Sequence, residues 1–335
     1  MILRLCGYVR SIFCSGNPAE ETAPMIKMQK RIKVLMVAVL AIGVLAPIRS
    51  KANNAQIEVT HAERKNTGTQ EAANSARQEF PFEFRDGLIW VQVQFRQSAA
   101  PQYFLLDSGA GLSVINLATM RRMGGVRGRR MVVRGVGTTT TGYWPQHLSA
   151  RSDSFPLPDC FLAVDLSELG RACERTVDGL IGADFFDSHV VQIDFAARKL
   201  RLLPSSEGLT NRTTLPLEIH GRALQVPIRV NDGPPQWVRL DTGCAAALHW
   251  VTSQVCPQDC KPSVSVALTT LTVNMAHTSV QLAGLRFDDV PTGIHKQQVF
   301  KGEAGLLGNE LLSRFHSVII DAKARRVILE GPAHP

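Results

Sequence analysis

The feature that most constrains this chain is an internal repeat. The stretches "YFLLDSGAG" around Asp107 and "WVRLDTGCA" around Asp241 each place one carboxylate between a short apolar run and a Ser-Gly or Thr-Gly pair. A Gly-Leu-Ile-Gly or Gly-Leu-Leu-Gly sequence follows each of them, beginning at Gly179 and Gly305. The copies are offset by 134 residues at the aspartates and by 126 at these glycines. A nearly constant offset indicates a duplicated domain, so we expect two similar halves.

The repeat extends on both sides of these motifs. The runs "FEFRDGLIWVQVQF" and "LEIHGRALQVPIRV" precede the two aspartates, and their β-branched and aromatic residues, interrupted by Gly-containing turns, are typical of strands. The stretches "VVQIDFAARKLRLLP" and "SVIIDAKARRVILEGP" close the two copies. We therefore predict an all-β protein with few short helices. It is divided into one lobe at residues 80–204, a linker at 205–214 and a second lobe at 215–335.

Composition and charge narrow the class of protein. The chain has 335 residues, of which 44% are hydrophobic and 20% charged, a globular composition with room for two domains. Its formal charge of +8 is concentrated in residues 1–55, which hold eight Lys or Arg and two acidic residues. The remainder has 29 basic and 27 acidic side chains. This nearly neutral body lacks the charge pattern of a nucleic-acid-binding protein, so we expect no nucleic-acid partner.

Residues 1–55 are predicted to be an N-terminal extension that carries an export signal. Basic residues precede the apolar run 34–46, and Pro47 and the small-residue sequence Ser50-Lys51-Ala52 follow it. Thirteen apolar residues are few for a bilayer span, which favours a cleaved signal over an uncleaved anchor, with a buried core helix as the third alternative. We expect a periplasmic or secreted protein that meets the membrane transiently or through this anchor. Translation could begin at Met1, Met25 or Met28.

Residues 56–79 are polar and show no apolar period. Such a segment cannot bury enough apolar surface to fold by itself, so it is predicted to be a flexible tether.

The paired motifs resemble those of two-lobed aspartic peptidases of the pepsin and retropepsin group. The likeness extends over residues 80–335 and is nearer to bacterial exported proteins built from retropepsin-like units than to pepsin. It implies two acid-protease-type β-barrel lobes with the active site between them. It also implies that Asp107 and Asp241 are the catalytic residues of an endopeptidase that acts on peptides or proteins.

The chemistry of such a pair explains why both copies are needed. Two neighbouring carboxylates cannot both ionise easily, so they share one proton. One then acts as a base toward water while the other donates to the carbonyl oxygen under attack, without metal or cofactor. The resemblance implies that Ser108 and Thr242 hydrogen-bond across the lobes. Gly109 and Gly243 let the backbone turn sharply beside the carboxylates.

A substrate also needs a cover, and "MVVRGVGTTTTGYWPQ" (131–146) suits a mobile hairpin. Gly135 and Gly137 lie between β-prone residues, as at a hairpin tip. Tyr143 and Trp144 are candidates to line the substrate site, with ordinary core packing as an equally weighted alternative. The corresponding stretch of the second copy, 264–275, has no glycine, so we predict a single flap.

Five cysteines follow the predicted signal. In an oxidising compartment, disulfides between cysteines close in sequence would join Cys160 with Cys173 or Cys256 with Cys260. Cys244 would then remain a free thiol. The alternative is a metal site formed by Cys244, His249, Cys256 and Cys260. Its spacing matches no standard zinc pattern, so we expect no metal.

The leading interpretation is an aspartic endopeptidase. The alternative is a catalytically silent peptide-binding or scaffold module that keeps the fold, since fold alone does not prove function. Both aspartates and both following glycines are intact, which favours the enzyme. One chain supplies both halves of the site, so we expect a monomer.

Overall fold

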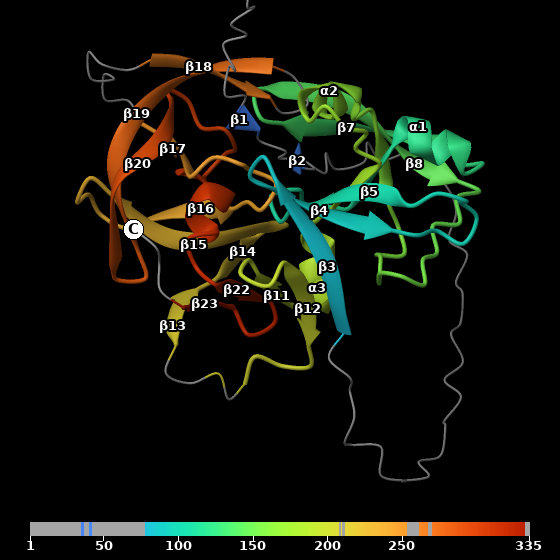
Figure 1. The fold of residues 1–335 in the computed structure, drawn as a ribbon. Coiled ribbons are helices and arrows are strands. Elements are labelled where there is room, and N and C mark those ends of the chain that lie inside the picture. The colour runs from blue at the N-terminus through green and yellow to red at the C-terminus, as the bar shows by residue number, and fades with distance from the viewer. Residues whose placement is uncertain are drawn as a thin grey trace, which may run out of the picture. The chain divides into compact units, whose positions relative to one another are not determined.

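The computed structural model describes residues 78–331 except 208, 210–211, 253–260 and 267–269, together with two short strands upstream, β1 (Leu35–Met36) and β2 (Leu40–Ala41). All described strands belong to one compact unit, Lys33–Pro335. Strands predominate (Figure 1), and the helices in the described residues are four short ones: α1 (Leu117–Arg122), α2 (Ser167–Ala172), α3 (Ala183–Ser188) and α4 (Asn309–Leu312). The prediction of an all-β fold is confirmed.

The first lobe is built from eight strands. In spatial order they run β7-β8-β9-β6-β10-β5-β4-β3. Their bounds are β3 (Gln78–Arg85), β4 (Leu88–Val93), β5 (Gln102–Leu106), β6 (Val114–Asn116), β7 (Val126–Gly135), β8 (Thr138–Gln146), β9 (Leu162–Val164) and β10 (Gly179–Ile181). Strand β10 lies between β5, to which it is parallel, and β6, to which it is antiparallel.

The second lobe repeats this arrangement strand for strand, in the order β18-β19-β20-β17-β21-β16-β15-β14. The bounds are β14 (Glu218–His220), β15 (Ala223–Val230), β16 (Gln236–Leu240), β17 (Leu248–Val251), β18 (Lys261–Val266), β19 (Thr270–Leu282), β20 (Leu285–His295) and β21 (Gly305–Leu307). Strand β21 is parallel to β16 and antiparallel to β17, as β10 is to β5 and β6. An additional pairing joins β15 and β19. The sequence repeat therefore has a direct structural counterpart.

A six-stranded region joins the lobes, in the order β13-β23-β22-β11-β12-β3, and we call it the shared sheet. Its further strands are β11 (Val190–Asp194), β12 (Lys199–Leu203), β13 (Thr213–Pro216), β22 (Ser317–Asp321) and β23 (Arg326–Glu330). At its centre β11 pairs with β22, and Gln192 lies opposite Ile319. These two residues occupy the same position in the two copies, so the sheet is arranged as a self-complementary interface between repeated halves.

Equivalent aspartates close the turns at the two ends of this region. The Asp194 carboxylate accepts a hydrogen bond from the backbone N–H of Ala197, and the Asp321 carboxylate accepts one from that of Ala324. Side chains of this kind stabilise turns locally. Both aspartates therefore have structural roles here.

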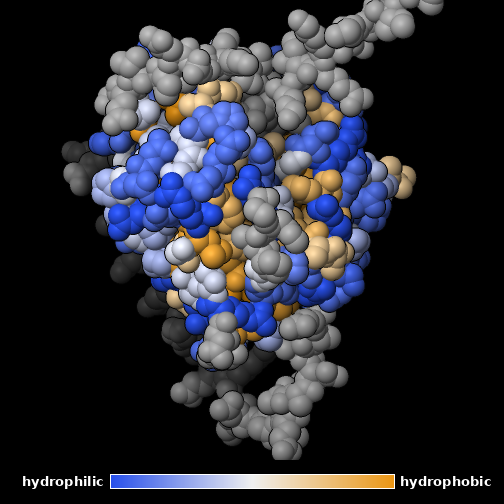
Figure 2. Space-filling model, turned by 60° about the vertical axis from the view of Figure 1, so that its left-hand side comes forward, coloured by the Kyte–Doolittle hydropathy of each residue, from blue (hydrophilic) through white to orange (hydrophobic). Residues whose placement is uncertain are grey.

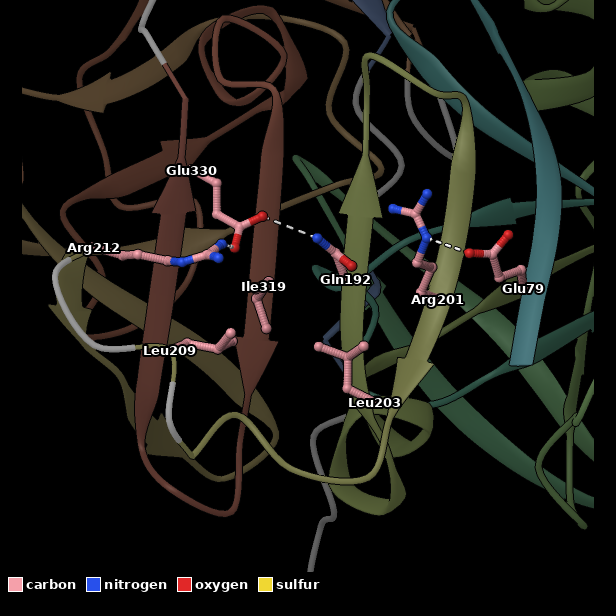
Figure 3. A pocket seen from close by; sticks show the side chains of 8 residues that line it. All are labelled: Glu79, Gln192, Arg201, Leu203, Leu209, Arg212, Ile319 and Glu330. Carbon is pink, nitrogen blue, oxygen red and sulfur yellow. Dashed lines mark hydrogen bonds and ion pairs between the residues drawn. The ribbon is translucent and has the colours of Figure 1, made fainter. Parts of the chain in front are cut away.

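The shared sheet also carries a cavity of about 320 Å³, drawn in Figure 3. Its polar lining groups are already paired with one another: Gln192 donates to Glu330 at 3.0 Å, and Arg201 donates to Glu79 at 2.6 Å. The rest of the lining is largely apolar, with Leu203 and Ile319 among it. These contacts give the charged side chains a structural role, because they join neighbouring strands of the sheet.

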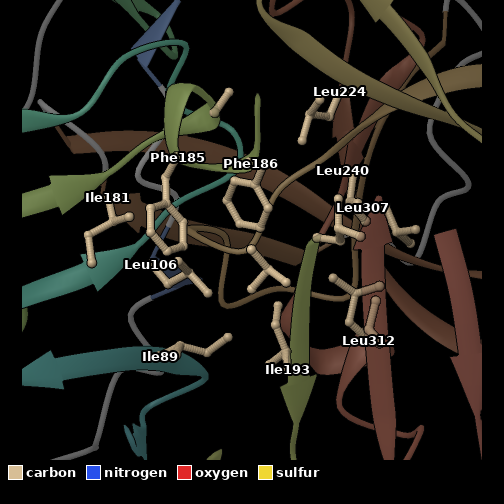
Figure 4. Packing of buried hydrophobic residues seen from close by; sticks show 14 of the residues in the cluster. Ile89, Leu106, Ile181, Phe185, Phe186, Ile193, Leu224, Leu240, Leu307 and Leu312 are labelled. Atoms are coloured by element: carbon tan, nitrogen blue, oxygen red, sulfur yellow. The ribbon is translucent and has the colours of Figure 1, made fainter. Parts of the chain in front are cut away.

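One hydrophobic cluster extends through both lobes and the shared sheet (Figure 4). Phe185 and Phe186 of α3 lie in its middle, with Leu106 and Ile181 from the first lobe and, from the second, Leu224, Leu240, Leu307 and Leu312. Burial of each such side chain contributes about 1.5–3 kcal/mol to stability. Figure 2 shows hydrophilic residues over much of one face of the molecule, with hydrophobic residues between them. Because the core is continuous, the lobes hold the ends of β5 and β16 in a fixed relation.

Candidate active site

The two predicted catalytic aspartates follow equivalent buried strands. Asp107 comes directly after β5, and its backbone N–H donates to the carbonyl of Ile181 in the neighbouring strand β10 at 2.9 Å. Asp241 comes directly after β16, and its N–H donates to the carbonyl of Leu307 in β21, also at 2.9 Å. The Gly-Leu-Ile and Gly-Leu-Leu strands thus fix the first residue of each Asp loop.

Four hydrogen bonds join the two Asp loops. The Ser108 hydroxyl donates to the carbonyl of Leu240 at 2.7 Å and accepts from the backbone N–H of Thr242 at 3.0 Å. In return the Thr242 hydroxyl donates to the carbonyl of Leu106 and accepts from the N–H of Ser108, both at 2.9 Å. All these groups are buried. Each hydroxyl therefore crosses to the other lobe and satisfies one donor and one acceptor there.

The backbone of each loop supports its carboxylate. Oδ1 of Asp107 accepts a hydrogen bond from the N–H of Ala110, and Oδ1 of Asp241 accepts one from Gly243, each at 3.0 Å. A Cβ atom on Gly109 would lie 2.4 Å from Oδ1 of Asp241. Only glycine lets the backbone of the first loop approach the second carboxylate this closely.

The two carboxyl groups are fully buried and interact with each other. Burial raises the pKa of Asp107 well above its ordinary range, and the negative charge of Asp241 and a hydrogen bond between the carboxyls raise it further. Burial also raises the pKa of Asp241, although the positive charge of Arg239 opposes this. Among the described residues no group donates to Oδ2 of either aspartate. Because the two buried carboxyls interact, they share one proton more readily than they ionise together.

A buried ion pair that the sequence analysis did not identify lies beside this pair. Arg239 is two residues before Asp241, and its guanidinium contacts Glu303 through two hydrogen bonds, one of them 2.8 Å from Nε to Oε2. Its Nη1 donates to the carbonyl of Gly109 in the other lobe at 2.7 Å. The sequence did contain a signal for this ion pair. The apolar run before Asp241 includes a charged residue, Arg239, whereas the run before Asp107 has none.

Asn309 is a second residue that sequence reasoning missed. Its side-chain amide donates to the carbonyl of Thr242 at 2.7 Å and to the carbonyl of Gly87, in the β3–β4 turn of the first lobe, at 2.8 Å. The equivalent position in the first copy is Ala183. Asn309 therefore adds a contact between the lobes that the first copy does not reciprocate.

The predicted flap is the hairpin β7–β8, whose tip contains Gly135 and Gly137. Val136, between the two glycines, is 1% exposed and packs against residues of the second lobe, among them Cys244 and Leu306. The second lobe has an equivalent hairpin, formed by β18 and β19. The tip of this second hairpin, 267–269, lies outside the described residues, so a single flap stays a prediction.

Tyr143 and Trp144 lie farther along β8. Tyr143 packs against the main hydrophobic cluster with Arg127 over its ring, and Trp144 packs against a second cluster of the first lobe. The structure thus brings Gly135 and Gly137 to a cavity beside Arg239 but places neither aromatic ring in its lining. A role of the two aromatic residues at the substrate site stays a prediction.

Two upstream segments pair with the edges of the hairpins. Strand β2 is antiparallel to β7, with Leu40 opposite Gly135. Strand β1 is parallel to β18, with Leu35 opposite Ser265. The remainder of the predicted export signal at 34–46 lies outside the described residues. No helix in the described part of the chain is long and apolar enough to span a membrane. Both hairpins therefore have an edge that accepts an extended segment.

The structure tests one of the two predicted disulfides. Cys160 is an exposed free cysteine, so a Cys160–Cys173 disulfide is not formed. The Sγ of Cys244 is 4.0 Å from the carbonyl oxygen of Ala246. The other members of the alternative sets, Cys256 and Cys260, lie outside the described residues.

His249, the remaining member of the alternative metal set, is paired with another histidine. Its Nδ1 is 2.7 Å from Nε2 of His295, and burial lowers the pKa of His249 to about 3, so its ring is neutral. No group of three or more His, Cys, Asp or Glu side chains within the described ranges is placed to hold a metal ion.

The sequence matches no protein-family model, and no similar curated protein was found. Among solved structures, the chain is similar to an aspartic proteinase from Irpex lacteus. The alignment covers 77% of this chain and 98% of that one, with 11% sequence identity and a TM-score of 0.40. A likeness at this level carries no conclusion about the chemistry of this chain.

Proposed function

We propose that this chain is an aspartic endopeptidase that hydrolyses peptide bonds with Asp107 and Asp241. The observation that carries the proposal is the buried pair of interacting carboxyls, whose loops are joined by reciprocal hydrogen bonds from Ser108 and Thr242 and whose pKa values are both raised. A fold gains no stability from two adjacent buried carboxyls. Perturbed groups of this kind are characteristic of catalytic sites.

The environment of the pair favours one distribution of its proton. The positive charge of Arg239 lowers the pKa of both carboxyls, and it opposes the effect of burial on Asp241 most directly. The two carboxyls share one proton, and we assign the charged form to Asp241 because Arg239 lies two residues before it. In this state Asp241 accepts a proton from the attacking water, and Asp107 donates its proton to the carbonyl oxygen.

The substrate would bind as an extended strand. The edges of β7 and β18 present backbone groups, and the pairing of β2 and β1 with these edges is direct support for their ability to take up an extended peptide. Strand addition gives affinity through the main chain and leaves specificity to the side-chain pockets. A peptide between the two hairpins is therefore the substrate class that suits this site.

The test uses a mixed peptide library and three variants of the full chain. Asp107→Asn and Asp241→Asn are each expected to reduce kcat/KM by about 10²–10⁴-fold, since each removes one half of the acid–base pair. The exposed Asp159 provides a matched control, and Asp159→Asn should cleave like the wild type. If the wild type binds peptides without cleaving any, the silent peptide-binding alternative replaces the enzyme.

A further inference from the structure

A charged cavity of about 670 Å³ lies where the flap tip meets the second lobe. Gly135 and Arg134 line it from the flap, and Arg239, Phe300, Lys301 and Glu303 line it from the second lobe. It is close to the candidate dyad, because the guanidinium of Arg239 donates to Gly109, whose backbone is packed against the Asp241 carboxylate. A peptide held at the flap edge would have a side chain within reach of this cavity.

The charges that line the cavity do not balance. Arg239 and Glu303 neutralise each other, since their side chains are only 4% and 6% exposed and share two hydrogen bonds. The guanidinium of Arg239 also stacks over the ring of Phe300 at 4.2 Å. Arg134 and Lys301 remain, both exposed, and neither forms an ion pair within the part of the chain that the structure describes. The cavity therefore has two uncompensated positive charges around a neutral, rigid floor.

The first lobe shows that the fold does not require this ion pair. Leu105 and Val177 occupy the positions equivalent to Arg239 and Glu303, and both are buried in an apolar cluster. A buried ion pair is seldom more stabilising than apolar residues of similar volume. The Arg239–Glu303 ion pair of the second lobe is therefore better explained by a role at the site than by a contribution to the stability of the fold.

We propose that this cavity recognises a carboxylate side chain of the peptide substrate, close to the bond that is cleaved. Arg134 and Lys301 supply the positive charges that contact the carboxylate. The Arg239–Glu303 pair fixes the floor and keeps Arg239 from being displaced by the substrate. The inference rests on the proposed peptidase function, and it adds a preference for Asp or Glu at one substrate position.

The experiment compares peptides that differ at one position only. Each residue around the cleavage site is varied in turn among Glu, Gln and Lys, and kcat/KM is measured at low and high salt. We expect one position at which Glu exceeds Gln by about tenfold and Lys is poorest, with the preference reduced at high salt because exposed charges are screened. Equal rates for Glu and Gln at every position would overturn the proposal.

Two double variants separate local recognition from a general effect of charge. Arg134→Gln with Lys301→Gln should remove the preference for Glu. The matched control is Arg129→Gln with Lys296→Gln, which removes the same charge from exposed positions outside the cavity lining and should retain the preference. Loss of the preference in both double variants would contradict a local site.

Binding to the Asp107→Asn chain distinguishes failure of the pocket from failure of the proposed function. Fluorescence anisotropy with labelled peptide pools, one containing Asp and Glu and one containing Asn and Gln, measures recognition without cleavage. Tighter binding of the acidic pool, lost in the Arg134→Gln, Lys301→Gln background, supports the pocket even if no peptide is cleaved. Cleavage by the wild type with equal binding of the two pools overturns the pocket and leaves the peptidase proposal intact.

Discussion

Thr242 shows how much of the site depends on single atoms. Its hydroxyl is both a donor to Leu106 and an acceptor from Ser108. Thr242→Val keeps the shape of the side chain but leaves both buried partners unsatisfied, which should lower the free energy of unfolding by about 1–3 kcal/mol. Thr242→Ser keeps the hydroxyl and should cost less. Chemical denaturation checks this, and equal stability of the Ser and Val variants would contradict the role of these bonds.

The residues after the two glycines set a prediction for pH dependence. Ala110 offers no side-chain donor to its carboxylate, and the thiol of Cys244 is a weak donor placed near the carbonyl of Ala246. Burial raises the pKa values of the pair, and no side chain at position 110 or 244 donates to the charged form to oppose it, so the pair keeps its shared proton to higher pH. Activity is lost at high pH when this proton leaves and at low pH when the second carboxyl is protonated. Both losses should therefore occur at higher pH than in a pair whose carboxylates accept hydrogen bonds from hydroxyl groups.

We therefore expect a bell-shaped plot of kcat/KM against pH, centred in the mildly acidic range and not at strongly acidic pH. Ala110→Ser and Cys244→Ser each introduce a donor that stabilises the charged form, so each should move the bell toward acid. A pH profile of wild type and both variants checks this. Movement of the profile toward neutral pH in the serine variants would show that another group governs the proton.

At the scale of elements, the upstream strands β1 and β2 occupy the hairpin edges that a peptide substrate would use. Proline cannot donate to a strand ladder, so Leu35→Pro with Leu40→Pro should free these edges. Because an occupied site binds substrate with reduced apparent affinity, KM should fall while kcat stays the same. Ala62→Pro in the predicted tether is the control, and steady-state kinetics is the measurement. An unchanged KM would mean that these strands do not compete.

The repeat was sufficient to predict the elements around the two aspartates. It predicted the strand before each Asp loop, and the hydroxyl contacts of Ser108 and Thr242 follow the expected pattern. It could not predict the partner of Arg239, because Glu303 is 64 positions away and only the fold brings them together. The absence of glycine from 264–275 did not prevent β18 and β19 from pairing, since the glycine content of a hairpin does not decide whether its strands pair.

For the whole molecule, both carboxyls lie in one chain and the shared sheet joins the halves internally. Specific activity should therefore stay constant when the protein is diluted about a thousand-fold, whereas an enzyme assembled from two chains would lose activity by mass action. Initial rates over a dilution series, with sedimentation at the same concentrations, check this. A specific activity that falls steeply with dilution would show that a second chain is needed.

The pairing of β11 with β22 also determines when this protein can fold. Val191 pairs with Ile320, and β11 and β22 are the two central strands of the shared sheet, so its centre cannot close until the chain has been synthesised past β22. Contacts between residues so far apart in sequence slow folding. During synthesis the edge of β11 stays unpaired, and an unpaired edge strand invites aggregation. Completion of the shared sheet is thus a late event in folding, which depends on the strands β22 and β23.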